Sequence, residues 1–433
     1  MRSKIAYTRR EFLAGAVAAW VAPTIIPARA FGANERIAIG HIGVGRRAQQ
    51  LMTFPAEAVS AAASDVYLKR LEDLKQRNEK FKEAALYQDY REMLARSGID
   101  GVIIATPDHW HALHAIHAME AGKDVYVEKP MTLTIREGRR MVETARKHGR
   151  ICQAGSQQRS QKANRIACEW VRNGRLGKVH TVHAANYPSP WECPLGEEPV
   201  PEGLDWDMWC GPTEVRPFHK ELYLPRVRGQ EAGWISYRPY SGGEVTGWGA
   251  HGLDQIQWAL GMDASGPVEV EPLLDLEPPD DQVHKGPRCQ VRLRYADGTE
   301  VILDDRGPGG GALFEGALGT LLIDRGRYEA SPEVDTTPPD ASGIHLYDSG
   351  AKTLNPVEDT EGHIGNWLYC MRTREMPVAD VEIGHRSSTA CHLVNIARWT
   401  RRKLAWNPVS EQFEGDEEAN TYIDRARRAP WVL

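Results

Sequence analysis

The 433-residue chain lacks the marks of several special protein classes. Its seven cysteines are scattered without a C-x-x-C pair, which is neither a disulfide framework nor a zinc pattern. We expect buried free thiols, with a Cys193–Cys210 disulfide as the alternative. After the first 30 residues no stretch is long and apolar enough to span a membrane, and we find no internal repeat. A net charge of -6 argues against a general nucleic-acid partner.

The N-terminus has the pattern of an export signal. The twin arginines Arg9 and Arg10 precede a short apolar run, and the small residues Ala28 and Ala30 end it in an A-x-A arrangement. This pattern predicts a Tat signal in residues 1–30 that is cleaved near Ala30. An ordinary Sec signal or an uncleaved anchor is the alternative. We therefore expect a periplasmic protein that engages the Tat machinery and has no stable membrane insertion.

The rest of the chain is too long for one ordinary core, so we expect two domains, at residues 31–155 and 156–433. In the first domain, strand and helix patterns alternate, which predicts an α/β fold with a parallel, doubly wound sheet. In the second, CQVRLRY at residues 289–295 alternates strictly, as an antiparallel strand with one buried face does.

A glycine motif of dinucleotide-binding proteins opens the first domain. The motif GVGRRA follows an apolar run; Gly43 allows a tight turn and Gly45 lets a pyrophosphate approach the backbone. Arg46 either reaches a phosphate or stays solvated. About twenty residues further, Asp65 stands where an acid binds the adenosine ribose hydroxyls, with a helix N-cap as its alternative role. A carboxylate there repels a 2′-phosphate, so we expect NAD rather than NADP.

Two further motifs fall at predicted strand ends, TPDHWH at residues 106–111 and EKP at residues 128–130. Ligands bind at the carboxyl ends of such strands, so both motifs should line the cofactor crevice near the nicotinamide. The residues expected to do so are Thr106, Pro107, His111, Glu128 and Lys129. Asp108, His109 and His111 crowd one helix start without a partner cluster, so we expect no metal site.

The motifs GVGRRA, TPDHWHALHAIHAMEAGKDVYVEKP, GSQQRS and GGEVTGWGAHGLDQIQWALGMD together resemble the Gfo/Idh/MocA family, over nearly the whole chain after the signal. The combination of T-P-x-x-x-H with A-G-K-x-V-x-x-E-K-P is much more specific than the glycine motif. The resemblance implies a Rossmann domain followed by an α+β domain with a large, open, mostly antiparallel sheet. In this family that sheet commonly forms oligomer contacts, so we expect a homo-oligomer.

Lys129 and His251 are the catalytic candidates. The resemblance gives the EKP lysine a role in binding the substrate hydroxyl and in proton transfer. Partial burial beside an oxidised nicotinamide would lower the pKa of Lys129 from about 10.4. His251 shares the polar stripe of a predicted helix with Asp254 and could accept the alcohol proton. The alternatives are a solvated Glu128–Lys129 pair and a structural histidine.

One position departs from the family pattern. Family dehydrogenases usually carry D-x-x-x-H at this helix, and here Gly247 stands in place of the aspartate. Asp254 could supply the orienting carboxylate from the next helical turn. The ordinary lysine–aspartate–histidine mechanism is therefore in doubt, although binding of NAD is not. The remaining substrate-binding candidates are Arg159, Tyr187, Tyr240, Trp248 and Asp254, and structural hydrogen bonding is the alternative for Arg159 and for His111.

A long Pro-, Gly- and Trp-rich insertion runs from about Pro188 to Tyr240. Long ordered loops tend to bind ligands, and aromatic faces suit sugar rings. The alternative is that its tryptophans pin the insertion to the core. Those tryptophans are Trp191, Trp206, Trp209 and Trp234.

The export signal and the cofactor site together favour redox-neutral chemistry, because no nicotinamide pool exists outside the cytoplasmic membrane. A protein folded around NAD before Tat export must restore its cofactor during each cycle. Either one sugar is oxidised while a second carbonyl compound is reduced, or a glycoside hydroxyl is transiently oxidised to permit elimination, water addition and re-reduction. We expect an oxidoreductase acting on a sugar, polyol or glycoside hydroxyl. An NAD-dependent glycosidase and an inactive sugar-binding module are the alternatives.

Overall fold

The computed structural model describes residues 36–223, 233–275, 286–357 and 359–433. The predicted export signal lies outside these residues. Among the helices they form, none combines the length and the apolar character needed to cross a lipid bilayer.

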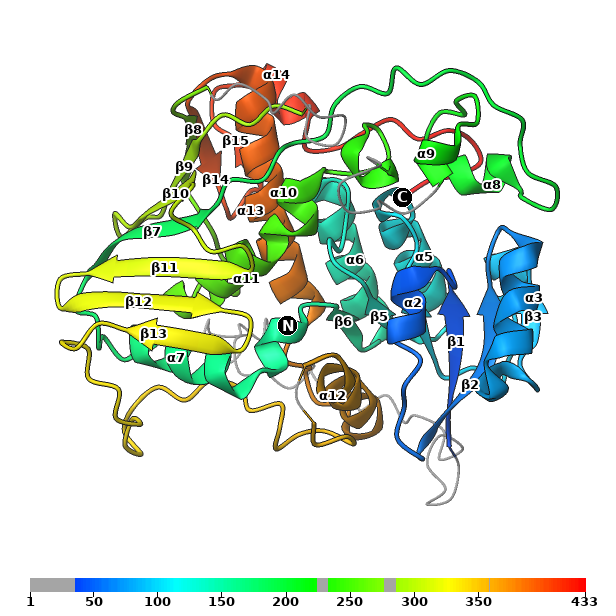
Figure 1. Ribbon diagram of the computed structural model, residues 1–433, viewed down its shortest axis with the longest axis horizontal. Helices are drawn as coiled ribbons and strands as arrows, with labels where there is room; N and C mark the ends of the chain where they lie inside the picture. Colours follow the sequence, from blue (N-terminus) through cyan, green and yellow to red (C-terminus); the bar gives the residue numbers. More distant parts are fainter. Residues whose placement is uncertain (1–35, 224–232, 276–285, 358) are drawn as a thin grey trace, which may run out of the picture. The chain divides into compact units, whose positions relative to one another are not determined.

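A parallel six-strand sheet forms the first part of the fold (Figure 1). Its strands are β1 (Ile37–Ile42), β2 (Ala58–Ser64), β3 (Ala85–Tyr87), β4 (Gly101–Ile104), β5 (Asp124–Val127) and β6 (Cys152–Ala154). They lie in the order β3-β2-β1-β4-β5-β6, and every neighbouring pair is parallel. The strand order therefore reverses at β1, which is where ligands bind in doubly wound sheets.

Both faces of this sheet are buried, as is usual for parallel strands. The connecting elements are α2 (Arg46–Gln50), α3 (Leu68–Arg77), η2 (Glu79–Phe81), α4 (Tyr90–Leu94), α5 (Asp108–Glu120) and α6 (Ile135–His148). Within β4, Val102 and Ile104 pack in the core formed with α4, α5 and α6. Ile103 packs on the other face against α12 (Asp359–Thr373), so a helix from late in the chain completes the first sheet.

A mixed nine-strand sheet forms the second part. Its strands are β7 (Val179–Ala185), β8 (Glu269–Pro272), β9 (Val291–Arg294), β10 (Glu300–Asp304), β11 (Gly311–Gly316), β12 (Gly319–Asp324), β13 (Arg327–Ala330), β14 (Leu404–Asn407) and β15 (Gln412–Phe413). The order is β13-β12-β11-β7-β10-β9-β8-β14-β15, and only the β7–β10 pair is parallel. The predicted fold class, a doubly wound sheet followed by a mostly antiparallel one, is confirmed.

Helices connect and cover the two sheets. They are η3 (Gln157–Ser160), α7 (Lys162–Arg172), α8 (Trp206–Cys210), α9 (Lys220–Tyr223), η4 (Trp234–Ser236), α10 (Glu244–Gly247), α11 (Gly249–Leu260), α13 (Val381–Thr400) and α14 (Glu417–Thr421). The long α13 packs against both α6 and α11 (Figure 1). Almost every residue of α11 is buried, so the polar stripe predicted for this helix faces protein and not solvent.

The described parts of the insertion, residues 188–223 and 233–240, build a small aromatic core of their own. Trp206 and Trp209 stack with ring centroids 4.5 Å apart, and Trp191 packs on Tyr237 at 5.3 Å. Trp206 and Trp191 therefore pack within the insertion and stabilise its own core. All seven cysteines are free thiols; Cys193 is partly exposed and the others are buried. The expectation of free thiols is confirmed.

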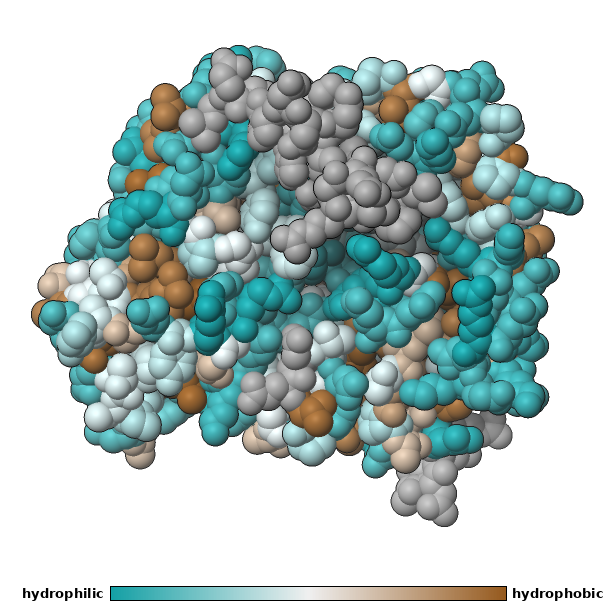
Figure 2. All heavy atoms as spheres, viewed as in Figure 1, coloured by the Kyte–Doolittle hydropathy of each residue, from teal (hydrophilic) through white to brown (hydrophobic). Residues whose placement is uncertain are grey.

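The surface in Figure 2 is mostly hydrophilic, and hydrophobic residues appear on it in small groups. Among the exposed hydrophobic side chains of the nine-strand sheet are Leu318, between β11 and β12, and Tyr328 on β13. Small groups of this kind are ordinary on folded proteins.

Candidate functional site

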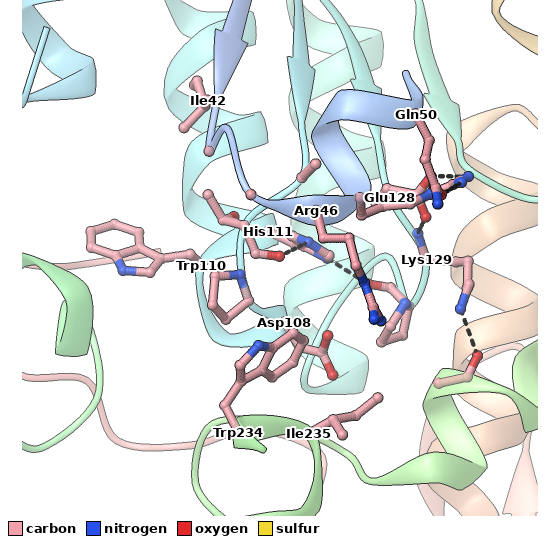
Figure 3. Close-up of a pocket in the computed structure, with 18 of the residues that line it drawn as sticks. Ile42, Arg46, Gln50, Asp108, Trp110, His111, Glu128, Lys129, Trp234 and Ile235 are labelled. Atoms are coloured by element: carbon pink, nitrogen blue, oxygen red, sulfur yellow. Dashed lines mark hydrogen bonds and ion pairs between the residues drawn. The ribbon is translucent and has the colours of Figure 1, made fainter. Parts of the chain in front are cut away.

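A cavity of about 1130 Å³ opens at the carboxyl ends of the parallel strands, around the strand-order reversal at β1. Its wall combines the β1–α2 loop and the ends of β2, β4 and β5 with parts of the insertion, α10 and α11. In the close-up, Arg46 and Asp108 face the same hollow, and Trp234 and Ile235 approach it from the opposite side (Figure 3). Cavities of this size hold cofactors and small substrates.

The glycine loop has the space that a dinucleotide needs. Gly43 has φ 81°, and a Cβ on it would lie 2.9 Å from Thr106 Cγ2, so only glycine lets the loop approach the end of β4. A Cβ on Gly45 would meet no atom nearer than Arg70 Nη1 at 3.8 Å, so its cavity side is open to a ligand. Arg46 is exposed and lines the cavity, where it can reach a phosphate. These residues fit NAD.

Asp65 lies at the end of β2 and lines the cavity, as the motif predicted. Its carboxylate accepts hydrogen bonds from the backbone N–H groups of Val44 and Tyr67, both at 3.0 Å. The first of these bonds ties the acid to the glycine loop. Arg70 Nη1 lies 4.0 Å from Asp65 Oδ2. Asp65 thus supports the loop and keeps oxygen lone pairs that a ribose hydroxyl can use.

Glu128 connects three chain segments below the cofactor loop. Its Oε1 accepts bonds from Arg47 Nε at 2.9 Å and from Gln157 Nε2 at 2.8 Å. Glu128 also accepts a bond from the backbone N–H of Lys129 at 3.2 Å. The buried carboxylate therefore fixes the backbone from which Lys129 extends. Neither Arg47 nor Gln157 was predicted as a site residue, although they lie inside the motifs GVGRRA and GSQQRS.

Lys129 points toward α10 and donates from Nζ to the carbonyl oxygen of Gly247 at 2.9 Å (Figure 3). Burial lowers the pKa of this lysine, and the charge of Arg47 lowers it further, while Glu128 and Glu244 oppose the shift. A half-buried lysine with a lowered pKa can bind a substrate hydroxyl and exchange a proton with it.

His251 lines the same cavity as Lys129 and is mostly buried. Burial lowers its pKa well below the ordinary value, and the charges of Lys129 and Arg325 lower it further. The imidazole is therefore neutral at neutral pH and has a ring nitrogen available to accept a proton. The two catalytic candidates, far apart in the sequence, meet in one cavity with the glycine loop.

His111 shapes the wall between the two strand-end motifs. Its Nδ1 lies 2.7 Å from the carbonyl oxygen of Pro130, and its Nε2 lies 2.7 Å from that of Thr106. Carbonyl oxygens only accept, so the ring makes both bonds only when it carries both protons. His111 therefore joins the Thr106–Pro107 turn to the EKP segment, and it has a structural part in the cofactor crevice.

Trp248 and Tyr187 form part of the wall beside the catalytic candidates. Trp248 is 44% exposed, with Lys129 Nζ 5.7 Å and the Arg325 guanidinium 5.2 Å from its ring centroid. Tyr187 donates its hydroxyl to the carbonyl oxygen of Gly309 at 2.7 Å. An exposed indole with cations near it offers a surface on which a sugar ring can stack.

Three predicted substrate-binding residues do not line this cavity. Arg159 is 1% exposed and binds the carboxylates of Asp254 and Asp263 at 2.9 Å. Asp254 also accepts from Ser387 on α13 at 2.7 Å, and among the described residues no hydrogen bond joins it to His251. Tyr240 is fully buried in the core of the insertion. All three side chains are buried away from the cavity, where they stabilise the fold.

A side chain at position 247 would contact Ile235 and Glu244. A Cβ on Gly247 would lie 2.8 Å from Ile235 Cδ1 and 3.4 Å from Glu244 Oε2. A larger side chain would therefore require the tip of Ile235 to shift, and a carboxylate is already present beside this position. Glu244 is buried and lines the cavity one helical turn before Gly247. Glu244 was not predicted as a site residue, although it lies inside the motif GGEVTGWGAHGLDQIQWALGMD.

The described residues contain no group of three or more histidine, cysteine, aspartate or glutamate side chains arranged to hold a metal ion. Four of the histidines have other neighbours: His109 contacts the insertion, and His111, His114 and His117 bind groups on the first sheet or its helices.

Family models match most of the chain. The model described as "Oxidoreductase family, NAD-binding Rossmann fold" matches residues 37–156, and "Oxidoreductase family, C-terminal alpha/beta domain" matches residues 186–433. The second match alone covers more than half of the chain. The chain belongs to the Gfo/Idh/MocA family. It is therefore an oxidoreductase with an NAD-binding Rossmann domain, of the type that acts on CH–OH groups.

The curated relatives align with only part of this chain. A 1-carboxy-3-chloro-3,4-dihydroxycyclohexa-1,5-diene dehydrogenase of Comamonas testosteroni is 31% identical over 154 residues, covering 34% of this chain and 38% of the relative. A glycosyl hydrolase family 109 protein of Shewanella baltica is 38% identical over 96 residues, covering 22% of this chain and 21% of the relative. The chain thus aligns with well under half of either relative.

A solved structure shares the fold over most of the chain. The aldose-aldose oxidoreductase of Caulobacter crescentus superposes with a TM-score of 0.61, covering 86% of this chain and 100% of that one. Because the two sequences are only 17% identical, the similarity shows a shared fold and nothing about activity.

Proposed function

We propose that the protein is an NAD-dependent oxidoreductase that acts on a hydroxyl of a sugar, polyol or glycoside without net redox change, and that it keeps its cofactor bound. The observation that carries the proposal is the cavity itself, in which Lys129 and His251 stand beside the glycine loop. The curated relatives include a dehydrogenase and glycosyl hydrolases, which supports a substrate bearing hydroxyl groups.

In this proposal the two side chains divide the work at the substrate hydroxyl. Bound NAD supplies the acceptor for the hydride of the oxidised carbon. Lys129 holds the hydroxyl oxygen, and neutral His251 accepts the hydroxyl proton on its imidazole nitrogen. In the reverse direction the same imidazole returns that proton to the oxygen. The lowered pKa of Lys129 favours proton exchange with the substrate hydroxyl, and His251 is in the neutral form that can accept a proton.

We favour NAD over NADP because Asp65 places a negative charge at the ribose end of the cavity. The carboxylate repels a 2′-phosphate, although Arg70 stands 4.0 Å from it. Equilibrium binding of the two dinucleotides to cofactor-free protein tests this preference. Tighter binding of NADP would contradict it.

The second candidate function is glycoside cleavage through transient oxidation and elimination. The glycosyl hydrolase family 109 relatives favour it, since the segment they share with this chain is 38% identical. The lack of an aspartate at position 247 also separates this site from the ordinary dehydrogenase pattern. A sugar-binding module without turnover is the third possibility.

Lys129→Ala and His251→Ala test the proposed site. We expect each variant to keep bound NAD, as released by denaturation and measured by mass spectrometry, and to lose about a hundredfold or more in turnover. Arg402→Ala is the control, because Arg402 pairs with Asp416 and Glu418, which do not line the cavity. Full turnover in both active-site variants would contradict the assignment.

Product analysis separates the candidate functions. A mixture of sugars and nitrophenyl glycosides is incubated with NAD-loaded protein, and the products are identified. Paired oxidised and reduced sugars support the oxidoreductase. Release of nitrophenol without accumulation of NADH supports the glycosidase, and no product from any sugar supports the binding module.

We further propose that the protein is exported through the Tat pathway after folding and forms a homo-oligomer. The twin arginines support the first statement, and the open nine-strand sheet supports the second. Size-exclusion chromatography with light scattering measures the oligomeric state, and a monomer at micromolar concentration would contradict it.

A further inference from the structure

The insertion is joined to the backbone directly after β2, beside Asp65. Leu68 N–H donates to the carbonyl oxygen of Gly203 at 3.1 Å, and Asp205 N–H donates to that of Val66 at 2.9 Å. These bonds run between two segments that lie more than a hundred residues apart in the sequence. They place the insertion against the end of the six-strand sheet where the glycine motif predicts adenosine.

Trp110 is the second point at which the insertion is attached. Its indole Nε1 donates to the carbonyl oxygens of Met208 and Trp209, at 3.0 and 2.9 Å. His109 Nε2 lies 2.8 Å from the same oxygen of Trp209. Gly211 packs directly against the indole of Trp110, since a Cβ at this position would lie 2.1 Å from the ring. Two residues of the TPDHWH motif therefore serve to hold the insertion.

Tyr223, in α9 of the insertion, reaches the adenosine end of the cavity. It lines the cavity, and its ring centroid lies 4.4 Å from the guanidinium of Arg70, which itself lies 4.0 Å from Asp65. The residue is 7% exposed, and its hydroxyl has no hydrogen-bond partner among the described residues. Because a buried hydroxyl without a partner is costly, this group points to a ligand that satisfies it.

The C-terminal tail fastens the insertion from outside. Arg428 donates to Asp207 Oδ1 at 2.8 Å and to the carbonyl oxygen of Gly211 at 3.1 Å. Arg425 donates to the carbonyl oxygen of His109 at 2.8 Å and pairs with Glu137 of α6 at 2.9 Å. One short segment thus bridges the insertion and two helices of the six-strand sheet, and none of these arginines lines the cavity.

We propose that the insertion locks the dinucleotide into the protein. Tyr223 forms the outer wall of the adenosine subsite and donates its hydroxyl to the adenosine, and the tail around Arg428 holds this wall in place. Release of the cofactor then requires the insertion to detach from Trp110 and from the segment after β2. The inference rests on the proposed function in one respect, namely that the bound ligand is NAD.

The experiment measures exchange of bound NAD and does not depend on turnover. Purified protein is mixed with an excess of isotopically labelled NAD, and the bound label is followed by mass spectrometry. The variants are Tyr223→Phe, which removes only the hydroxyl, Tyr223→Ala, which removes the wall, and Arg428→Ala, which loosens the tail. Arg402→Ala is again the control, because its ion pairs with Asp416 and Glu418 do not involve the insertion.

We expect the wild type and Arg402→Ala to exchange slowly, over hours, and both Arg428→Ala and Tyr223→Phe to exchange about tenfold faster or more. Tyr223→Ala should be fastest. Added NAD should restore saturation in every variant. If Arg428→Ala and Tyr223→Phe exchange as slowly as the wild type, or if the wild type itself exchanges within seconds, the inference is overturned.

Failure of the proposed function would look different. A wild type that retains NAD for hours, but turns over neither sugars nor glycosides, would remove the proposed activity and leave the locking role supported. A wild type that turns over sugars while its NAD exchanges freely would support the proposed activity and overturn the locking role.

Discussion

Glu244 is the buried carboxylate nearest to the position where the family motif has aspartate. Its Oε2 would lie 3.4 Å from a Cβ on Gly247, whose carbonyl oxygen binds Lys129 Nζ. The negative charge of Glu244 raises the pKa of Lys129 and so opposes the effect of burial. A carboxylate from the preceding helical turn thus acts on the lysine that the missing aspartate would have faced.

Glu244→Gln removes this charge and keeps the shape of the side chain. The pKa of Lys129 should fall further, so the limb of the kcat profile that reports Lys129 should move to lower pH by about half a unit to one unit. Bound NAD and KM should change little. Glu315→Gln, which removes a carboxylate paired with Arg306, serves as the control. A limb that stays in place would show that Glu244 does not act on Lys129.

Asp108 gives a prediction about stability. Burial raises the pKa of this cavity-lining carboxyl from 3.8 to about 6, although the nearby charge of His111 and a hydrogen bond from Ser241 lower it. Between these two pH values the folded state binds a proton that the unfolded state has lost. Stability therefore falls as pH rises through this window, and above pH 6 the cost is fully present.

Asp108→Asn should remove that cost, because the amide oxygen still accepts from Ser241 and carries no charge. We expect the variant to exceed the wild type in unfolding free energy at pH 7.5 by up to about 3 kcal/mol, and by much less at pH 4. Urea unfolding at the two pH values measures the difference. Asp89→Asn is a control of opposite sign, because Arg91 lowers the pKa of Asp89. An equal effect at both pH values would contradict the prediction.

At the scale of elements, local patterns predicted most of the first sheet. β5 and α6 belong to the alternating strand and helix patterns of the first domain, and Thr134 and Glu137 form a capping box at the start of α6. The rule that ligands bind at strand ends also predicted that Lys129 and Asp65 line one crevice, and both line the cavity. These features depend on residues that are close in the sequence.

Features set by distant contacts could not be predicted in this way. The helix α11 was predicted, but its polar stripe was assigned to the site because the sequence does not show that Arg159 pairs with Asp254, 95 residues away. The sequence likewise does not show that Trp367 of α12 lies on the first sheet. Tyr223 belongs to no motif, so only the fold reveals its place at the cavity.

For the whole molecule, the order of folding and export can be tested. We expect protein from the exported fraction to begin near Phe31 and to carry one NAD per chain, because the cofactor is enclosed before transport. Replacement of Arg9 and Arg10 by lysine should keep the chain in the cytoplasm. N-terminal sequencing and mass spectrometry of the denatured protein measure both properties. An exported protein without NAD would contradict the proposed reason for Tat export.

The seven free thiols bear on the proposed export in the folded state. Burial raises the pKa of Cys168 to about 12 and that of Cys210 to about 11, so neither supplies the thiolate that would attack the disulfide of a disulfide-forming catalyst. A chain that crossed the membrane unfolded would present all seven to an oxidising environment and could be trapped in wrong cross-links. A chain exported in its folded state, as proposed, would keep six thiols buried and would leave only Cys193 partly exposed to that chemistry.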